Sequence, residues 1–419
     1  MSASTPEAPR APLMTTADAL DVLLAVAVPL TDTEEISTLE AGGRVLARDV
    51  VSTLDVPPQD VSAMDGYAVR SAELAEAAPG ASIGLPVSQR IPAGYPPEPL
   101  APGSVARIFT GAGVPPGADA VVMQEQVELD GDEARFFAVP QAGAWVIGQG
   151  ADIRRGSAVL PAGVRLTPQA LGLAASIGCA TLEVRRRVRV AVFFTGDELV
   201  MPGTPLAPGQ IYNSNRFVLR ALLERLGCEV SDYGIVRDSL DATRATLRAA
   251  AHAHDLIVTC GGVSVGEEDH VRPAVEAEGR ISLWQIAMKP GKPLAYGAVR
   301  RTDGHGEAHF MGLPGNPVSS FVTFLIFVRP FVLRLMGVEQ VAPHALSLRA
   351  DFTQTKTDRR NEFLRARLNA GGGLEPFPNQ ASAVLTSTVW GDGLIDNPPD
   401  HAIQAGEWVR FLPFSDLLG

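Results

Sequence analysis

Between Val188 and Leu335 the chain alternates short, strongly apolar runs with segments of helical spacing. This alternation constrains the fold more than any other feature, because strands separated by helices form mostly parallel sheets with helices on both faces. The predicted strands are residues 188–194, 228–236, 256–260, 281–287 and 309–311, and the predicted helices are 216–226, 240–251, 270–277 and 318–335. We therefore predict a doubly wound, mostly parallel α/β/α domain in this region.

The segments on either side of this region have different sequence patterns. Helical spacing predicts one helix that begins after Thr16 as its N-cap and a second at Pro168–Ile177. Residues 56–145 are dense in proline and glycine between short apolar runs, which indicates a small β-rich domain. Beyond Pro343 alternating strands return, and we expect a small C-terminal β-barrel. A chain of 419 residues is thus predicted to fold as multidomain α/β plus β.

Composition excludes several classes of function. The net charge of -12 disfavours a general nucleic-acid binder, which needs basic surface. The three cysteines are far apart and indicate neither a disulfide framework nor a zinc knuckle. No secretory signal is recognisable, and the apolar segment 321–335 is interrupted by Arg329, Pro330 and Arg334, so no membrane span is predicted. The expected compartment is the cytoplasm.

Chemically active residue types follow each predicted strand of the α/β domain. In open α/β sheets, ligands bind outside the carboxyl ends of the strands. Glycines, carboxylates and lysines recur in the five loops at that edge, which are residues 195–198, 237–239, 261–269, 288–293 and 312–320. This edge is the candidate active site.

Carboxylates beside lysines suit a divalent cation that holds phosphate groups, because Mg²⁺ commonly binds one or two carboxylates plus substrate oxygens. Glu198 and Asp238 are the carboxylates in question, and Lys289 and Lys292 are the lysines. Each of these residues, taken singly, also has a purely structural interpretation. Glu198 could lie in the first turn of a helix, Asp238 could be an N-cap, and the lysines could simply be exposed to solvent. Their recurrence on one edge favours the functional interpretation.

One competing motif is present. Gly262–Gly266 matches the G-x-S-x-G nucleophile elbow, with Ser264 as the nucleophile of a serine hydrolase. No HGGG oxyanion loop precedes it, and the acids at 267–269 would oppose an acyl oxyanion. Neither a P-loop nor a dinucleotide-binding fingerprint occurs.

The stretch GLPGNPVSS, residues 312–320, contains two prolines that have no N–H to offer a phosphate. Pro314 and Pro317 instead fix the backbone on both sides of Asn316. We expect a stiff rim that presents Asn316 and a few carbonyl groups to the ligand, whereas Gly261 and Gly262 are better suited to cradle phosphate.

The strings that carry these residues together resemble the molybdopterin molybdenumtransferases, the molybdenum-insertion enzymes to which the E domain of gephyrin is related. They are SAMDGYAV (62–69), RIFTGAGVPPGADAVVMQE (107–125), TGDELV (195–200), IYNSN (211–215), CGGVSVGEEDH (260–270), MKPGKPLAYG (288–297), GLPGNPVSS (312–320) and QASAVLTS (380–387). They extend from residue 62 almost to the end of the chain, and together they are highly specific.

The resemblance implies insertion of molybdenum from molybdate into adenylylated molybdopterin, with release of AMP and with Mg²⁺ as the cation. It implies catalytic roles for Asp65, Thr110, Glu198 and Asp238, of which Glu198 and Asp238 are the tentative magnesium ligands. The implied substrate-binding residues are Gly261, Gly262, Ser264, Asp269, Lys289, Lys292, Pro314, Asn316 and Pro317. Asp65-Gly66 and Thr110-Gly111 are also good turn sequences, which is the structural alternative for that pair.

The resemblance also implies four domains and an elongated homodimer. Domain I, which forms the dimer, would comprise residues 1–55 with 146–182, domain II 56–145, domain III 183–336 and domain IV 337–419. In that arrangement the partner subunit supplies Asp65 and Thr110 to the cleft.

Two alternatives and one departure accompany this assignment. The first alternative is a molybdopterin adenylyltransferase, which shares the doubly wound domain but needs neither flanking β domain. A separate molybdopterin adenylyltransferase is also an expected partner of this chain. A scaffold role would need a linker or an added domain. Residues 146–153 lack an arginine and a glutamate that the family commonly has there, which puts ligand affinity in question only if those residues bind ligand.

Overall fold

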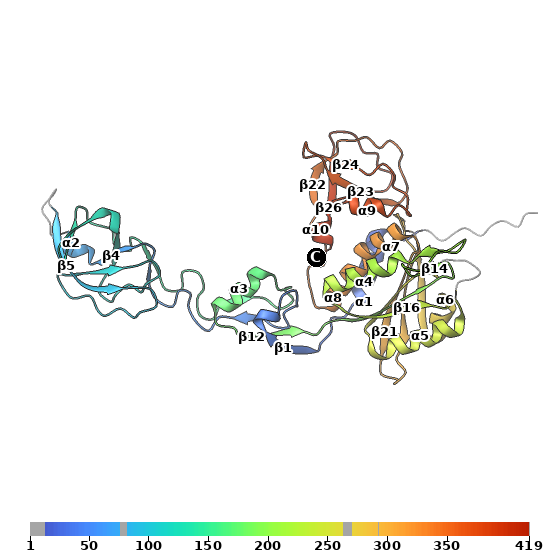
Figure 1. The fold of residues 1–419 in the computed structure, drawn as a ribbon, viewed down its shortest axis with the longest axis horizontal. Helices are drawn as coiled ribbons and strands as arrows, with labels where there is room; N and C mark the ends of the chain where they lie inside the picture. Colours follow the sequence, from blue (N-terminus) through green and yellow to red (C-terminus); the bar gives the residue numbers. More distant parts are fainter. Residues whose placement is uncertain (1–12, 76–81, 263–269, 292, 419) are drawn as a thin grey trace, which may run out of the picture.

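The computed structural model describes residues 13–75, 82–262, 270–291 and 293–418. The molecule is elongated (Figure 1). A β-rich domain with β4, β5 and α2 lies at one end, a small unit with α3, β1 and β12 lies in the middle, and the α/β unit lies at the other end beside the C-terminal domain.

The α/β unit is built on a six-stranded sheet in the order β16-β13-β17-β21-β20-β18. The first four strands are parallel and the last two are antiparallel to their neighbours. Their bounds are β13 (Arg189–Thr195), β16 (Glu229–Val236), β17 (Leu256–Cys260), β18 (Gly279–Gln285), β20 (Pro293–Arg300) and β21 (Glu307–Leu313). The predicted doubly wound, mostly parallel sheet is confirmed in this form.

Strand β20 was not predicted, because its sequence follows a Pro-Gly-Lys-Pro stretch that was interpreted as part of a loop. Since β20 returns antiparallel between β18 and β21, the end of β18 still points to the same edge as the ends of β17 and β21. The loop after β18 therefore reaches the predicted edge despite the missed strand.

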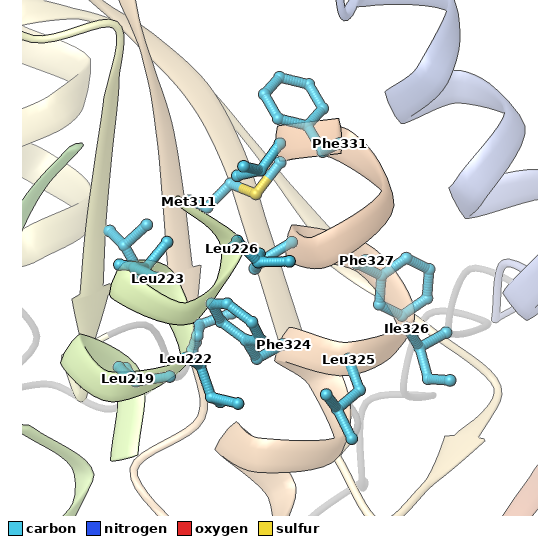
Figure 2. Close-up of a cluster of buried hydrophobic side chains, with 14 of the residues drawn as sticks. Leu219, Leu222, Leu223, Leu226, Met311, Phe324, Leu325, Ile326, Phe327 and Phe331 are labelled. Atoms are coloured by element: carbon cyan, nitrogen blue, oxygen red, sulfur yellow. The ribbon is translucent and has the colours of Figure 1, made fainter. Parts of the chain in front are cut away.

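Helices cover both faces of the sheet, and the alternation of side chains along β13 shows how. Val190, Val192 and Phe194 join one buried cluster, whereas Ala191 and Phe193 join the cluster on the other face. Helices α4 (Ser214–Leu226) and α7–α8 cover the first face, and α5 (Leu240–Ala253) and α6 (Val271–Glu278) cover the second. Figure 2 shows leucines of α4 packed against phenylalanines of the α7–α8 segment.

The segment Pro317–Leu335 is one continuous helical rod of α7 (Pro317–Thr323), a π-helical turn (Phe324–Val328) and α8 (Arg329–Leu335). By length and composition alone this segment could cross a membrane, although Arg329 and Arg334 interrupt its apolar sequence. In the described structure 94% of its most apolar window is buried in the protein. It is the central core helix of the α/β unit.

The N-terminal helix α1 (Thr16–Val26) packs against α8, and Ala19 and Leu23 are buried in the same core. By its packing this helix belongs with the α/β unit, although the predicted division placed it in domain I. Its N-cap is Thr15, whose hydroxyl accepts from the Asp18 N–H at 3.1 Å, one residue earlier than predicted.

The middle unit pairs distant segments of the chain. Strand β1 (Thr33–Ser37) pairs with β12 (Thr181–Arg185), and β2 (Val50–Val51) pairs with β11 (Ala158–Leu160). Helix α3 (Pro168–Ser176) packs on this unit, with the 3-10 turn η1 (Thr38–Glu40) beside it. The β-rich domain inserted between them has the sheet order β7-β4-β6-β5-β9-β8. Its elements are β4 (Gly66–Val69), α2 (Ser71–Leu74), β5 (Ile83–Ile91), β6 (Val105–Ile108), β7 (Ala120–Met123), η2 (Gln124–Gln126), β8 (Val127–Asp130) and β9 (Glu133–Phe136).

Residues 146–153 lie at the junction of the middle unit and the β-rich domain. Strand β10 (Val146–Ile147) pairs with β3 (Val61–Ser62), and the side chain and backbone N–H of Gln149 donate to Asp55 and Asp60. Residues 146–149, where the sequence departs from the family pattern, therefore contact residues 55–62 at the domain junction.

The C-terminal domain is a curled sheet in the order β19-β23-β25-β26-β22, with β24 beside β23. A bridge between Ala350 and Leu374 links the end of β22 back to β24. The structure thus shows a curled sheet, and its closure into the predicted C-terminal β-barrel stays a prediction. The elements are β19 (Met288–Lys289), β22 (Leu346–Arg349), β23 (Asn361–Leu368), β24 (Leu374–Pro376), α9 (Thr386–Trp390), β25 (Gly393–Asn397), β26 (Trp408–Pro413) and α10 (Phe414–Leu417).

Candidate functional site

A cavity of about 1050 Å³ lies at the carboxyl edge of the parallel strands. One wall is the sheet edge, and the opposite wall comes from residues 360 and 380–383 of the C-terminal domain. All five predicted loops contribute to it, through residues 195, 196, 198, 238, 261–262, 289–291, 314–317 and 319. The cavity is called the cleft below.

The two candidate metal-binding carboxylates both line the cleft. Glu198 follows β13 and Asp238 follows β16, so neighbouring strands deliver them to one edge. Beside them the Thr195 hydroxyl is buried without a hydrogen-bond partner among the described residues. This part of the cleft therefore offers oxygen donors of the type that hard cations prefer.

The glycine turn after β17 approaches β13 closely. Gly261 and Gly262 have φ of +93° and +63°, a region that residues with a Cβ rarely adopt. A Cβ on Gly261 would lie 2.7 Å from the Thr195 carbonyl oxygen. The Gly261 N–H donates to the Leu313 carbonyl at 3.2 Å, so this donor is already used within the sheet edge, and the place of Gly261 in a phosphate pocket stays a prediction. The N–H of Gly262 makes no such backbone bond among the described residues.

Gly261→Ala is expected to destabilise the α/β unit by about 1–3 kcal/mol, because it combines backbone strain with a clash against a carbonyl that has no room to move. Urea unfolding measures the effect. Gly209→Ala is the matched control, since Gly209 has a similar φ of +85° but a Cβ there would meet no atom within 4 Å. Equal losses in the two variants would show that close packing at Gly261 contributes nothing.

The Pro314–Pro317 turn lies on the cleft, but its carbonyl groups point into the protein. The Cys260 thiol donates to the Pro314 carbonyl at 2.9 Å, and the Asn215 amide donates to the Gly315 carbonyl at 2.7 Å. Burial raises the pKa of Cys260 to about 11, so the thiol stays protonated. The stiff rim stays a prediction. The carbonyl groups of Pro314 and Gly315 are not free to bind a ligand, because they already accept hydrogen bonds from Cys260 and Asn215.

The same turn is joined to the C-terminal domain. Val318, in the first turn of α7, donates its N–H to the Ser382 carbonyl at 3.0 Å. Asn316 is the N-cap residue and Pro317 occupies the first helical position, which suits proline. One helix N-terminus thus connects both walls of the cleft.

Lys289 also bridges the two walls. Its Nζ donates to Glu362 at 2.7 Å and lies 3.4 Å from Asp358. The strand that carries it, β19, pairs with β23 of the C-terminal domain. Lys289 is therefore engaged in an interdomain ion pair while it lines the cleft, and its role in holding phosphate or molybdate stays a prediction.

The C-terminal wall was missed by reasoning from the strand ends. Arg360 lines the cleft and holds Asp358 through Nε and Nη2 at 2.9 and 2.7 Å, which lowers the pKa of Asp358. Residues 380–383 belong to the string QASAVLTS, which contributed to the resemblance, but no pattern in the sequence placed it opposite the sheet. Such long-range proximity has no local signal.

Asp65 and Thr110 do not lie on the cleft of their own chain. They lie together in the β-rich domain, which is at the opposite end of the molecule from the α/β unit (Figure 1). The Thr110 N–H and hydroxyl each donate to the same Asp65 carboxylate oxygen at 2.8 Å. These two bonds, the backbone one first, lower the pKa of Asp65. Three further predicted site residues, Ser264, Asp269 and Lys292, lie outside the described residues.

Three family models match the chain in sequence order. They are the MoeA N-terminal region (domain I and II) at residues 14–178, a probable molybdopterin binding domain at 191–334 and the MoeA C-terminal region (domain IV) at 347–414. The chain is 40% identical to molybdopterin molybdenumtransferase of Haemophilus influenzae, over 93% of this chain and 96% of the relative. It is 38% identical to molybdopterin molybdenumtransferase 2 of Mycobacterium tuberculosis, over 90% and 91% respectively. Among solved structures, a molybdopterin biosynthesis MoeA protein from Pyrococcus horikoshii matches with a TM-score of 0.78 at 31% identity, over 96% of this chain and 99% of that chain.

Proposed function

Because the chain belongs to the molybdopterin molybdenumtransferase family, an enzyme family that inserts molybdenum during molybdenum cofactor biosynthesis, we propose that it acts on adenylylated molybdopterin and releases AMP in the cleft. The observation that carries this proposal is the gathering of Glu198 and Asp238 at one sheet edge, opposite Arg360 of the C-terminal domain. A phosphoanhydride needs both cationic and metal-bound positions around it.

We propose Mg²⁺ as the cation, with Glu198 and Asp238 as its protein ligands. The donor set fits, because carboxylate oxygens and the unpartnered Thr195 hydroxyl are hard donors. Among the described residues no three acidic, histidine or cysteine side chains form a metal cluster, so the other positions fall to water and substrate oxygens. When bound, the ion would neutralise charge on the phosphate oxygens.

The remaining groups of the cleft bind and orient the anionic substrates. Arg360 uses Nε and Nη2 on Asp358 and makes no hydrogen bond through Nη1 to a described residue, which leaves that donor for a substrate oxygen. The Gly262 N–H is a second candidate donor. Lys289 positions the C-terminal wall through Glu362. We place molybdate beside the Pro314–Pro317 turn, whose backbone is held by Cys260 and Asn215.

We further propose a homodimer in which the partner subunit supplies Asp65 and Thr110 to each cleft. The support is geometric: these residues belong to the β-rich domain, which the middle unit separates from the α/β unit that carries the cleft (Figure 1). The hydrogen bonds from Thr110 lower the pKa of Asp65 and keep its carboxylate ionised, which suits a metal-binding role. The cytoplasm and transient contact with a molybdopterin adenylyltransferase remain expectations.

The test is to incubate the full chain with adenylylated molybdopterin, Mg²⁺ and molybdate. The proposal predicts that AMP is released in step with metal loading of the pterin. If the protein instead consumes ATP on bare molybdopterin and releases no AMP, the adenylyltransferase alternative replaces it.

A further inference from the structure

Two arginines lie side by side on the β-rich domain, beside the turn that carries Asp65 and Thr110. Strands β5 and β6 are parallel neighbours, and their register pairs Arg90 directly with Arg107. Like charges opposite one another in a sheet are destabilising. The pairing of Arg90 with Arg107 is therefore expected to cost some stability.

An aromatic ring holds the two guanidinium groups in place. The Arg90 guanidinium carbon lies 4.5 Å from the centre of the Phe109 ring, and that of Arg107 lies 4.6 Å from it. Cation–π contacts of this length orient arginine without neutralising it. Phe109 immediately precedes Thr110, so the arginine pair and the Asp65–Thr110 bond share one turn.

The two arginines differ in what else they contact. Arg107 donates to the Gly66 carbonyl at 2.9 Å and to the side chain of Gln124, and is thereby fixed. Arg90 is exposed and makes no hydrogen bond or ion pair to any residue that the structure describes. Its whole donor fork is available to a ligand.

We propose that Arg90 and Arg107 form an oxyanion-binding site on the β-rich domain, beside the turn that carries Thr110, and that this site contributes to binding of an anionic substrate. Arginine forks match tetrahedral oxyanions in charge and geometry, and both substrates carry them, as molybdate or as the phosphates of adenylylated molybdopterin. The inference rests on the proposed function, because this surface reaches a cleft only in the proposed dimer.

Arg90→Gln in the full chain tests the proposal, because Arg90 supports no described hydrogen bond. Loss of one charged contact is expected to raise KM about tenfold for one of the substrates, with kcat changed less than about twofold. A higher KM for molybdate alone would identify molybdate as the ligand, and a higher KM for adenylylated molybdopterin would identify the phosphates of that substrate. The KM of Arg90→Lys should lie between those of the parent and of Arg90→Gln, since lysine keeps the charge but lacks the two-pronged guanidinium group.

Arg135→Gln is the control, because Arg135 is a half-buried arginine of the same domain that is paired with Asp130. The melting temperature of Arg90→Gln is expected to equal or exceed that of the parent, since a like-charge pair is removed. Unchanged KM for both substrates, with normal turnover of the parent, overturns this inference alone. A parent that releases no AMP overturns the proposed function instead.

Discussion

Glu198→Gln is expected to lower turnover by about 100-fold or more while leaving the fold intact. The substitution keeps the shape of the side chain but removes the negative charge that we propose holds the cation. Glu198 makes no side-chain hydrogen bond to a described residue, so the loss has little structural component. Turnover is measured as AMP release at saturating molybdate, with a Mg²⁺ titration beside it.

The matched control is Glu224→Gln. Glu224 lies on α4 and pairs with Arg220 on the exposed face of that helix, where an ion pair contributes little. Near-normal turnover is expected in this variant. Parental turnover in Glu198→Gln at every Mg²⁺ concentration would remove Glu198 from the site.

Asp255→Ala is expected to destabilise the α/β unit by about 3 kcal/mol, because it leaves the largely buried Arg186 with only the exposed Asp32 as an ion-pair partner. Both carboxylate oxygens of Asp255 accept from Arg186, at 2.7 and 2.9 Å, and one also accepts from the Arg189 N–H at 2.9 Å. Arg186 in turn pairs with Asp32 at 2.8 Å, so this group joins the middle unit to the sheet. Urea unfolding followed by circular dichroism measures the loss.

The pH dependence of this contribution has a defined sign. Burial opposes ionisation of Asp255, but the bonds from Arg186 and Arg189 outweigh it, and the pKa lies below its ordinary value. The stabilisation is therefore complete above the unfolded pKa of about 3.9 and is lost as pH falls through the folded pKa. Glu229→Gln removes the exposed ion pair with Arg189 and should cost less than about 1 kcal/mol. Equal losses in both variants would contradict the role of Asp255.

The α/β unit and its site edge were predictable because the relevant signals are local. Strand β17 matches its predicted bounds, and the alternation of buried side chains along β13 follows from period-two geometry. Once parallel strands are recognised, the meeting of Glu198, Asp238 and Gly262 at one edge follows from topology alone.

The other wall of the cleft was not predictable in this way. The Ser382 carbonyl meets the N–H of Val318, and Glu362 meets Lys289, across long stretches of chain. No periodicity encodes such contacts between domains. Strand β20 was missed for a local reason, since its first residue is a proline and it follows a glycine turn. The pairing of Arg90 with Arg107 depends on a parallel register that the sequence does not specify.

The central claim is that each cleft takes Glu198 from one subunit and Asp65 from the other, and mixed dimers test it most directly. Asp65→Asn and Glu198→Gln are each expected to abolish turnover as homodimers. In an isolated heterodimer of the two variants, one cleft would carry both substitutions and the other neither, so about half of the parental AMP release should return. An inactive heterodimer, formed and folded, would show that both residues act within one chain and would contradict the account.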